Sequence, residues 1–270
     1  MILLRRNCGL SECISVYMIA MAAADLLVMI INVMLYYIFS NHFPLSFLSF
    51  TPVCRVILCL SVVTLDLSVW FTVTFTFDRF VAICYAKVKL KYCIARTATK
   101  VVIAFSTFIV VKNNPIAFVY EAERTVNNVQ WGCRTIAVFS SLRVSLPYSW
   151  FHSIMLVWLP FALIILLNSL TISRILVASR ARRELRGQQS GMQSDVEVEN
   201  RRKSIILLLT ISSSFVLLWM TTAVSFLMTR ISNTNYYRGD YMATGYIATE
   251  VGAMLKHLSS SPNTCIYAAT

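Results

Sequence analysis

Six long apolar segments constrain this chain more than any other feature of its sequence. Each holds about 20 residues or more, the length that a helix rising about 1.5 Å per residue needs to cross a bilayer core of about 30 Å. Polar side chains interrupt the third segment at Lys112 and the sixth at Lys256. The segments are expected at residues 13–40, 54–84, 97–120, 150–178, 204–231 and 241–267. The sequence therefore predicts an all-α fold, an integral membrane helical bundle formed as one domain over residues 1–270.

Composition argues against other classes of protein. Only 13% of the residues are charged, against about 25% in soluble domains. The apolar segments are too long for barrel strands of about 10 residues. The eight cysteines show no zinc-ligand pairing such as Cys-x2-Cys, so we expect no metal. The net charge of +12 lies in basic clusters between apolar segments, which orient a chain in a bilayer, so nucleic acid is not an expected partner.

Lysine and arginine are distributed unevenly between the two sets of connections. More than twice as many lie before the first segment and in the second and fourth connections as in the first, third and fifth connections. This excess predicts that the richer set is cytoplasmic in a multi-pass protein of the cell membrane. The connection 180–203 is polar and rich in Gln and Ser, which is typical of a flexible linker. Its basic ends are expected to meet lipid head groups or a protein partner.

The second apolar segment has a thiol at its outer end and an acid-base pair at its inner end. Arg79 follows Cys54 by 25 residues, which is about 38 Å of helix at about 1.5 Å per residue. A snorkelling arginine beside an aspartate would explain the pair Asp78-Arg79 but not this spacing. The pattern resembles the rhodopsin-like, or class A, G-protein-coupled receptors, whose third helix begins with a disulfide cysteine and ends in Asp-Arg-Tyr. Phe80 stands in place of the tyrosine.

Further motifs extend the resemblance over nearly the whole chain. Cys133 matches the loop cysteine that bonds to the third helix in the family, which implies a disulfide with Cys54. Pro160 is similar to the proline of the fifth helix. The first apolar segment carries the signature of the family's second helix, so the resemblance implies helices 2 to 7 within the chain, with helix 1 and the C-terminal tail absent from it.

The resemblance implies a switch in the sixth and seventh helices. Phe215 and Trp219 are similar to the aromatic pair of the sixth helix, although Thr221 stands where a proline is usual. Asn263 and Tyr267 are similar to the ends of the Asn-Pro-x-x-Tyr motif of the seventh. Two aromatic residues four positions apart are equally explained by packing within the bundle.

The implied function is to transmit the binding of an extracellular small ligand to a heterotrimeric G protein, with no enzymatic step. Asp78 would hold Arg79 until the inner ends of the fifth and sixth helices part. An acid at the start of the sixth helix often provides a second restraint, but basic residues occupy that region here. The residues implied in G-protein coupling are Asp78, Arg79, Phe80, Arg201, Arg202 and Lys203.

Asp25 is a carboxylate in the middle of the first apolar segment, among small residues. By resemblance, Asp25, Ser259 and Asn263 would form a hydrated polar cluster able to hold Na⁺, and no other cofactor is expected. A protonated, hydrogen-bonded aspartate with a structural role is the alternative.

The candidate ligand pocket comprises His152, Trp219, Lys256 and His257, whose potential cations would suit a ligand with a carboxylate. The finer resemblance is to an orphan subgroup related to the brain receptor that responds to tryptophan and phenylalanine. In that receptor a pocket histidine lies eight residues before the fifth-helix proline, as His152 does here. The ligand would then be an aromatic amino acid or a peptide. His152 at a helix interface near the outer membrane boundary is the alternative.

Two other functions stay open at this point. Asp25, Asp66, Lys256 and His257 would also suit the permeation path of a solute carrier or channel, although no internal repeat with paired broken helices is evident. A truncated, non-signalling receptor product is the second. An intramembrane enzyme is disfavoured, because neither His-Glu-x-x-His nor Gly-x-Ser-x-Gly occurs.

Overall fold

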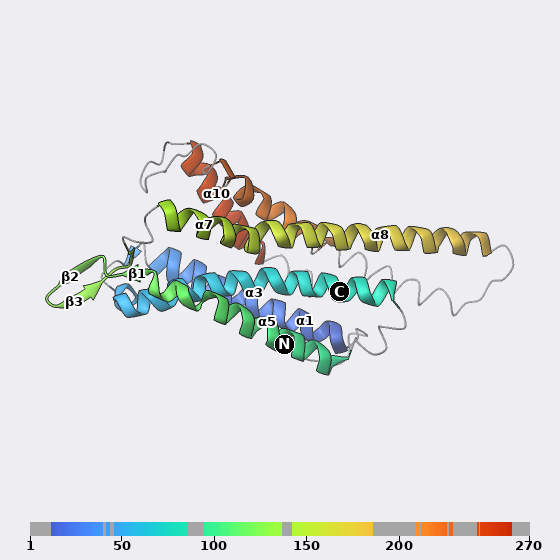
Figure 1. The fold of residues 1–270 in the computed structure, drawn as a ribbon, viewed down its shortest axis with the longest axis horizontal. Coiled ribbons are helices and arrows are strands. Elements are labelled where there is room, and N and C mark those ends of the chain that lie inside the picture. Colours follow the sequence, from blue (N-terminus) through green and yellow to red (C-terminus); the bar gives the residue numbers. More distant parts are fainter. Residues whose placement is uncertain are drawn as a thin grey trace.

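The described parts of the long apolar segments are helical (Figure 1). The computed structural model describes residues 12–39, 42–43, 46–85, 94–136, 142–185, 209–210, 212–225, 227–228, 242 and 244–260. In chain order the helices are α1 (Glu12–Val28) with the π-helix η2 (Met29–Phe39), the short η3 (Phe47–Ser49), α3 (Thr51–Cys84), α5 (Ala95–Asn113) with η4 (Asn114–Phe118), α7 (Leu142–Ser153), the π-helix η5 (Ile154–Trp158), α8 (Leu159–Leu185), the helix Ser212–Ser225 and α10 (Thr244–Leu258).

Four of these helical stretches are long and apolar enough to cross a membrane. They are Cys13–Phe39, Thr51–Cys84, Ala95–Phe118 and Pro147–Val177. Large apolar side chains on them face outward, including Leu26, Phe108 and Leu166, each more than half exposed. Apolar surface of this extent is suited to lipid contact. The first four predicted segments are therefore confirmed as helices, and the fifth and sixth contain the shorter helices Ser212–Ser225 and Thr244–Leu258.

The helix α3 lies at the centre of the bundle. It packs against α1 and α5 on one side and α8 on the other (Figure 1). One apolar cluster joins α1, α3 and α5 around Met18 and Phe75. A second joins α3, α8 and the helix Ser212–Ser225 around Val69, Ile164 and Trp219. Because neighbours cover α3, its polar side chains must find partners within the protein, on α3 itself or on other helices.

Two local features have simple backbone causes. The π-helical turn η5 ends two residues before Pro160 of α8, which has no N–H to donate to the helix ladder. On the helix α10, a Cβ added to Gly252 would lie 3.1 Å from the backbone nitrogen of Thr222, so the two helices approach closely there. The hydroxyl of Thr222 donates to the Gly252 carbonyl at 2.7 Å across this approach.

The connection between η4 and α7 contains short antiparallel strands that the sequence did not predict. The strands β2 (Arg124–Val126) and β3 (Val129–Trp131) form a hairpin, and β1 (Tyr120–Glu121) pairs with β4 (Arg134–Thr135). Asn127 and Asn128 form the two-residue turn with positive φ of 52° and 61°, which asparagine tolerates better than most residues. The hairpin stands at the end of the bundle where α3 begins (Figure 1).

Candidate functional site

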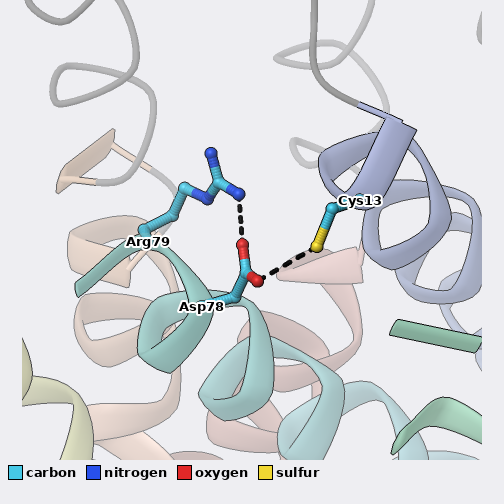
Figure 2. Close-up of polar contacts among 3 residues, drawn as sticks. All are labelled: Cys13, Asp78 and Arg79. Atoms are coloured by element: carbon cyan, nitrogen blue, oxygen red, sulfur yellow. Dashed lines mark hydrogen bonds and ion pairs between the residues drawn. The ribbon is translucent and has the colours of Figure 1, made fainter. Parts of the chain in front are cut away.

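The C-terminal end of α3, which the charge count predicts to be the inner one, holds a buried ion pair between adjacent residues. The Arg79 guanidinium contacts the Asp78 carboxylate, and the two residues are only 4% and 0% exposed. The Cys13 thiol of α1 donates to the other carboxylate oxygen of Asp78, with 3.2 Å between sulfur and oxygen. Figure 2 shows the carboxylate lying between the guanidinium and the thiol. Both oxygens of Asp78 therefore have a partner.

Arg79 is also held by an aromatic ring. Its guanidinium carbon lies 5.7 Å from the centre of the Phe75 ring, one turn earlier on α3. Cation–π contacts of this kind contribute about 0.5–2 kcal/mol. The Arg79 Nε has no hydrogen-bond partner within the part of the chain that the structure describes. The guanidinium is thus paired and packed, yet it keeps donor capacity for another acceptor.

Cys13 was not among the predicted site residues, although its position contains a signal. It begins the first predicted segment, and Asp78 lies near the end of the second. Antiparallel neighbours place these two ends together, so a contact was deducible. Phe80 packs against Tyr85, with ring centres 5.8 Å apart. The remaining predicted coupling residues Arg201, Arg202 and Lys203 lie outside the described residues.

The N-terminal end of α3, predicted to be the outer one, is bonded to the hairpin connection. A disulfide joins Cys54 to Cys133, with 6.3 Å between their Cα atoms, which confirms the predicted bridge. The Gly132 N–H donates to the Ser49 carbonyl at 2.7 Å, and the Thr51 hydroxyl donates to the Gly132 carbonyl at 2.9 Å. A bridge over such a loop typically contributes about 2–4 kcal/mol. The connection is therefore fixed over this end of the bundle.

Trp219 links three helices in the interior. Its indole N–H donates to the Ser259 hydroxyl at 2.9 Å. Its ring lies 5.4 Å from that of Phe215, which meets Phe161 of α8 edge to face at 5.9 Å. The aromatic pair therefore contacts both α8 and the end of α10. The predicted switch residues Asn263 and Tyr267 lie outside the described residues.

Asp25 is buried against α3. The Ser68 hydroxyl donates to its carboxylate at 2.6 Å, and Asp25 is 2% exposed. Of the predicted polar cluster, Asp25 is thus bonded to Ser68 and Ser259 to Trp219. The third member, Asn263, lies outside the described part of the chain.

A cavity of about 170 Å³ opens between α3, α7 and the stretch from η4 to β1. His152 lies on its wall, with its ring parallel to that of Tyr148 at 6.3 Å between centres. Burial, and after it Tyr36, raises the pKa of Tyr120 in the adjoining strand. The cavity is lined by Val62, Ile116, Val119, Tyr120, Tyr148 and His152.

The other predicted pocket residues lie elsewhere. Trp219 is buried in the interior cluster, and His257 packs edge to face on Tyr37 with 5.6 Å between ring centres. Lys256 belongs to α10, and its backbone carbonyl accepts from Ser259 at 2.7 Å. Among the four predicted pocket residues, only His152 lines the cavity found in the described residues.

A second buried ion pair joins the middle of α3 to the end of α5. The Lys112 ammonium lies 2.7 Å from the Asp66 carboxylate, and Asp66 is fully buried. The Asn113 amide donates to the same carboxylate oxygen at 2.6 Å. Lys112 and Asn113, which interrupt the third apolar segment, thus connect that segment to α3. The sequence had singled out Asp66 only as a possible residue of a permeation path.

A known protein family matches nearly the whole chain. The profile described as "7 transmembrane receptor (rhodopsin family)" matches residues 1–267. No curated protein matches the chain.

Proposed function

The chain belongs to the rhodopsin family of seven-transmembrane receptors, and from this premise we propose that it transmits the binding of an extracellular small ligand to a heterotrimeric G protein. The observation that best supports this proposal is the arrangement of α3, which has the disulfide at one end and the buried Asp78–Arg79 pair at the other. The family match favours this function over a solute carrier or channel. Members of this family are receptors and not enzymes, so they act by a change of conformation and not by a covalent reaction.

In the inactive state, Asp78 holds Arg79 at the inner surface. The carboxylate is itself fixed by Cys13 from α1, so the pair is tied to a neighbouring helix. In the active state the inner ends of α8 and of the helix Ser212–Ser225 move apart, Arg79 leaves Asp78, and a groove opens for the C-terminal helix of a G-protein α subunit. The freed guanidinium donates to backbone carbonyls of that helix. Phe80, Arg201, Arg202 and Lys203 border the groove in this proposal.

The contacts of Trp219 can transmit a change of conformation between the two ends of the helical bundle. Its bond to Ser259 and its packing through Phe215 on Phe161 connect α10, the helix Ser212–Ser225 and α8. A ligand that shifts α10 or α8 changes the packing of this group, which biases the position of the helix Ser212–Ser225. Asn263 and Tyr267 would extend the switch toward the inner surface.

Asp25 is the candidate Na⁺ position of this proposal. Its carboxylate and the bonded Ser68 hydroxyl are oxygen ligands of the kind that hard cations prefer. Ser259 and Asn263 would complete the site. A bound Na⁺ would supply positive charge that balances the buried carboxylate.

We further propose an aromatic amino acid or a peptide as the ligand class, as in the orphan subgroup that the sequence resembles. The support is a cavity with three aromatic rings, those of Tyr120, Tyr148 and His152, at the end of the bundle that carries the disulfide. Lys256 and His257 would meet a ligand carboxylate if α10 turns toward the cavity.

Replacing Cys13 by alanine is expected to raise basal G-protein activation about fivefold. The thiol bond to Asp78 is worth about 1 kcal/mol net, and its loss shifts the equilibrium between closed and open states by that factor. Cys13→Ser keeps a donor and serves as the matched control. The readout is GTPγS uptake by purified heterotrimers with receptor in lipid nanodiscs. Equal basal rates for Cys13→Ala, Cys13→Ser and wild type would contradict this role of Cys13.

The proposed function itself is tested by the wild-type chain in the same assay. The chain is expected to accelerate GTPγS uptake above that of empty nanodiscs for at least one class of heterotrimer. The resemblance assigns the segment of Asp25 to the second helix, so the chain is also tested with a first helix from a related receptor placed before it. Acceleration only by the extended chain would show that residues 1–270 need a preceding helix in order to signal. No acceleration by either would contradict the proposal.

A further inference from the structure

The helix Ser212–Ser225 is bonded to α10 over its C-terminal half. The Thr222 hydroxyl donates to the Gly252 carbonyl at 2.7 Å, and a Cβ added to Gly252 would lie 3.1 Å from the Thr222 backbone nitrogen. Three residues earlier, the Trp219 indole N–H donates to the Ser259 hydroxyl at the end of α10. Helices that are packed this closely resist movement relative to one another. The C-terminal half of this helix is therefore fixed to α10.

The N-terminal half of the same helix is bonded to α8 instead. The Asn168 amide donates to the Ser212 hydroxyl, with 2.8 Å between nitrogen and oxygen. Ser212 is fully buried, and Phe215, three residues later, packs edge to face on Phe161 of α8. Ser212 precedes Trp219 by seven residues, which is about two helical turns. The Asn168–Ser212 bond therefore lies between the two helix ends that move apart in the proposed function.

This bond joins two helices that the Asp78–Arg79 pair does not join. Asp78 and Arg79 are neighbours on α3, and the Cys13 thiol that bonds to Asp78 belongs to α1. Neither contact holds α8 against the helix Ser212–Ser225. The apolar packing between these two helices is non-directional, whereas a hydrogen bond fixes both a distance and a direction. The Asn168–Ser212 bond supplies such a directional restraint.

The restraint is suited to being released. The Nδ2 of Asn168 has the Ser212 hydroxyl as its acceptor, but Oδ1 is buried without a partner among the described residues. A buried acceptor of this kind is less stable than one that is bonded to water. Separation of the two helices breaks the bond from Nδ2 and at the same time admits water to Oδ1. The gain partly offsets the loss, which brings the closed and open arrangements closer in free energy.

We propose that Asn168 is a positioning residue that holds the helix Ser212–Ser225 against α8 in the closed state. Opening breaks the bond to Ser212, while the Thr222–Gly252 contact stays in place as the point about which the helix turns. The inference rests on the proposed receptor function and deepens it, because it identifies an uncharged restraint where the resemblance implied an acid that this sequence lacks.

The test measures how often the two helices separate in nanodiscs without G protein. Thr171 is fully buried and follows Asn168 by three residues, on the same face of α8. Thr171→Cys places a thiol there, and its rate of alkylation by iodoacetamide, followed by peptide mass spectrometry, reports the open fraction. Adding Ser212→Ala is expected to raise this rate about threefold or more, because a polar bond between membrane helices is lost and Asn168 is left without its acceptor.

A double replacement separates a restraint from a packing defect. Asn168→Leu with Ser212→Ala replaces both partners by apolar groups. It is expected to return alkylation to the rate of Thr171→Cys alone or below, since neither partner then leaves a polar side-chain atom buried without a bond. The control is Thr107→Ala on α5, which removes a hydroxyl that bonds within its own helix and is expected to leave the rate unchanged.

An unchanged rate with Ser212→Ala, a double variant as fast as that single variant, or an equal rise with Thr107→Ala would overturn the inference. Basal GTPγS uptake, measured in parallel, tests the proposed function separately. Faster alkylation with Ser212→Ala but no uptake by any form of the chain would support the restraint and contradict the receptor function.

Discussion

Replacing Arg79 by alanine is expected to reduce G-protein activation to the level of nanodiscs without receptor. In the proposed active state, Arg79 is the group that donates to the carbonyls of the inserted α-subunit helix. Hydrogen bonds to a charged group contribute about 1.5–3 kcal/mol each, so losing even one lowers activation about tenfold or more. The measurement is the initial rate of GTPγS uptake at matched amounts of folded receptor.

Two further variants test whether this loss of G-protein activation comes from the guanidinium group of Arg79. Arg79→Lys keeps the positive charge but not the planar fork of donors, so it is expected to recover only a small part of the activity. Arg134→Ala removes an arginine from an exposed ion pair in the hairpin connection and is expected to leave coupling unchanged. Arg79→Ala also leaves Asp78 buried with the Cys13 thiol, so its thermal stability must be measured beside its activity. Undiminished uptake with the alanine variant would remove the coupling mechanism proposed here.

Breaking the Asp66–Lys112 pair is expected to have the largest effect on stability. Lys112→Met leaves a fully buried carboxylate whose remaining partner among the described residues is the Asn113 amide. An uncompensated buried charge of this kind costs about 3–5 kcal/mol, which is a large share of a typical stability of about 5–15 kcal/mol. The measurement is the thermal unfolding midpoint of the purified protein in one detergent.

Replacing both Asp66 and Lys112 tests whether the unpaired charge causes the loss of stability. The double variant Asp66→Leu with Lys112→Met removes both charges, and it is expected to regain most of the lost stability. Glu121→Gln breaks the exposed ion pair with Arg134 and is expected to cost less than about 1 kcal/mol. A double variant less stable than Lys112→Met would show that the charge is not what destabilises the single variant.

The architecture was predictable because its signals are local or repeated. Apolar length alone located the segments that include α1, α3, α5 and α8, since a bilayer imposes a minimum number of residues on each span. The pairing of Cys54 with Cys133 followed from resemblance to a family in which both positions are occupied. The pair Asp78-Arg79 was evident because its partners are adjacent in sequence.

Contacts between helices were less predictable, because a helix sequence does not fix its rotation about its axis. Lys112 and Asn113 were interpreted as interruptions of a span, whereas they turn toward Asp66 on α3. Cys13 was identified as the start of a segment but not as the donor to Asp78. The strands of the hairpin connection are two or three residues long, too short for an alternating pattern to be recognised.

Pocket residues were the least predictable, because a pocket depends on several helices at once. His152 lines the cavity, whereas Trp219 lies in the interior cluster and His257 packs on Tyr37. The cavity residues Val62 and Ile116 carry no polar group, so their sequence gave no reason to single them out.

The central claim is that this chain passes a change of conformation to a heterotrimeric G protein through the inner end of α3. The most direct measurement is whether the chain in nanodiscs retains a heterotrimer from which nucleotide has been removed, and whether GTPγS then releases it. A nucleotide-free complex requires Arg79 to have left Asp78 and the groove to be occupied. The account predicts co-purification that GTPγS reverses and that Arg79→Ala abolishes. No co-purification, or one that GTPγS and Arg79→Ala leave unchanged, would contradict it.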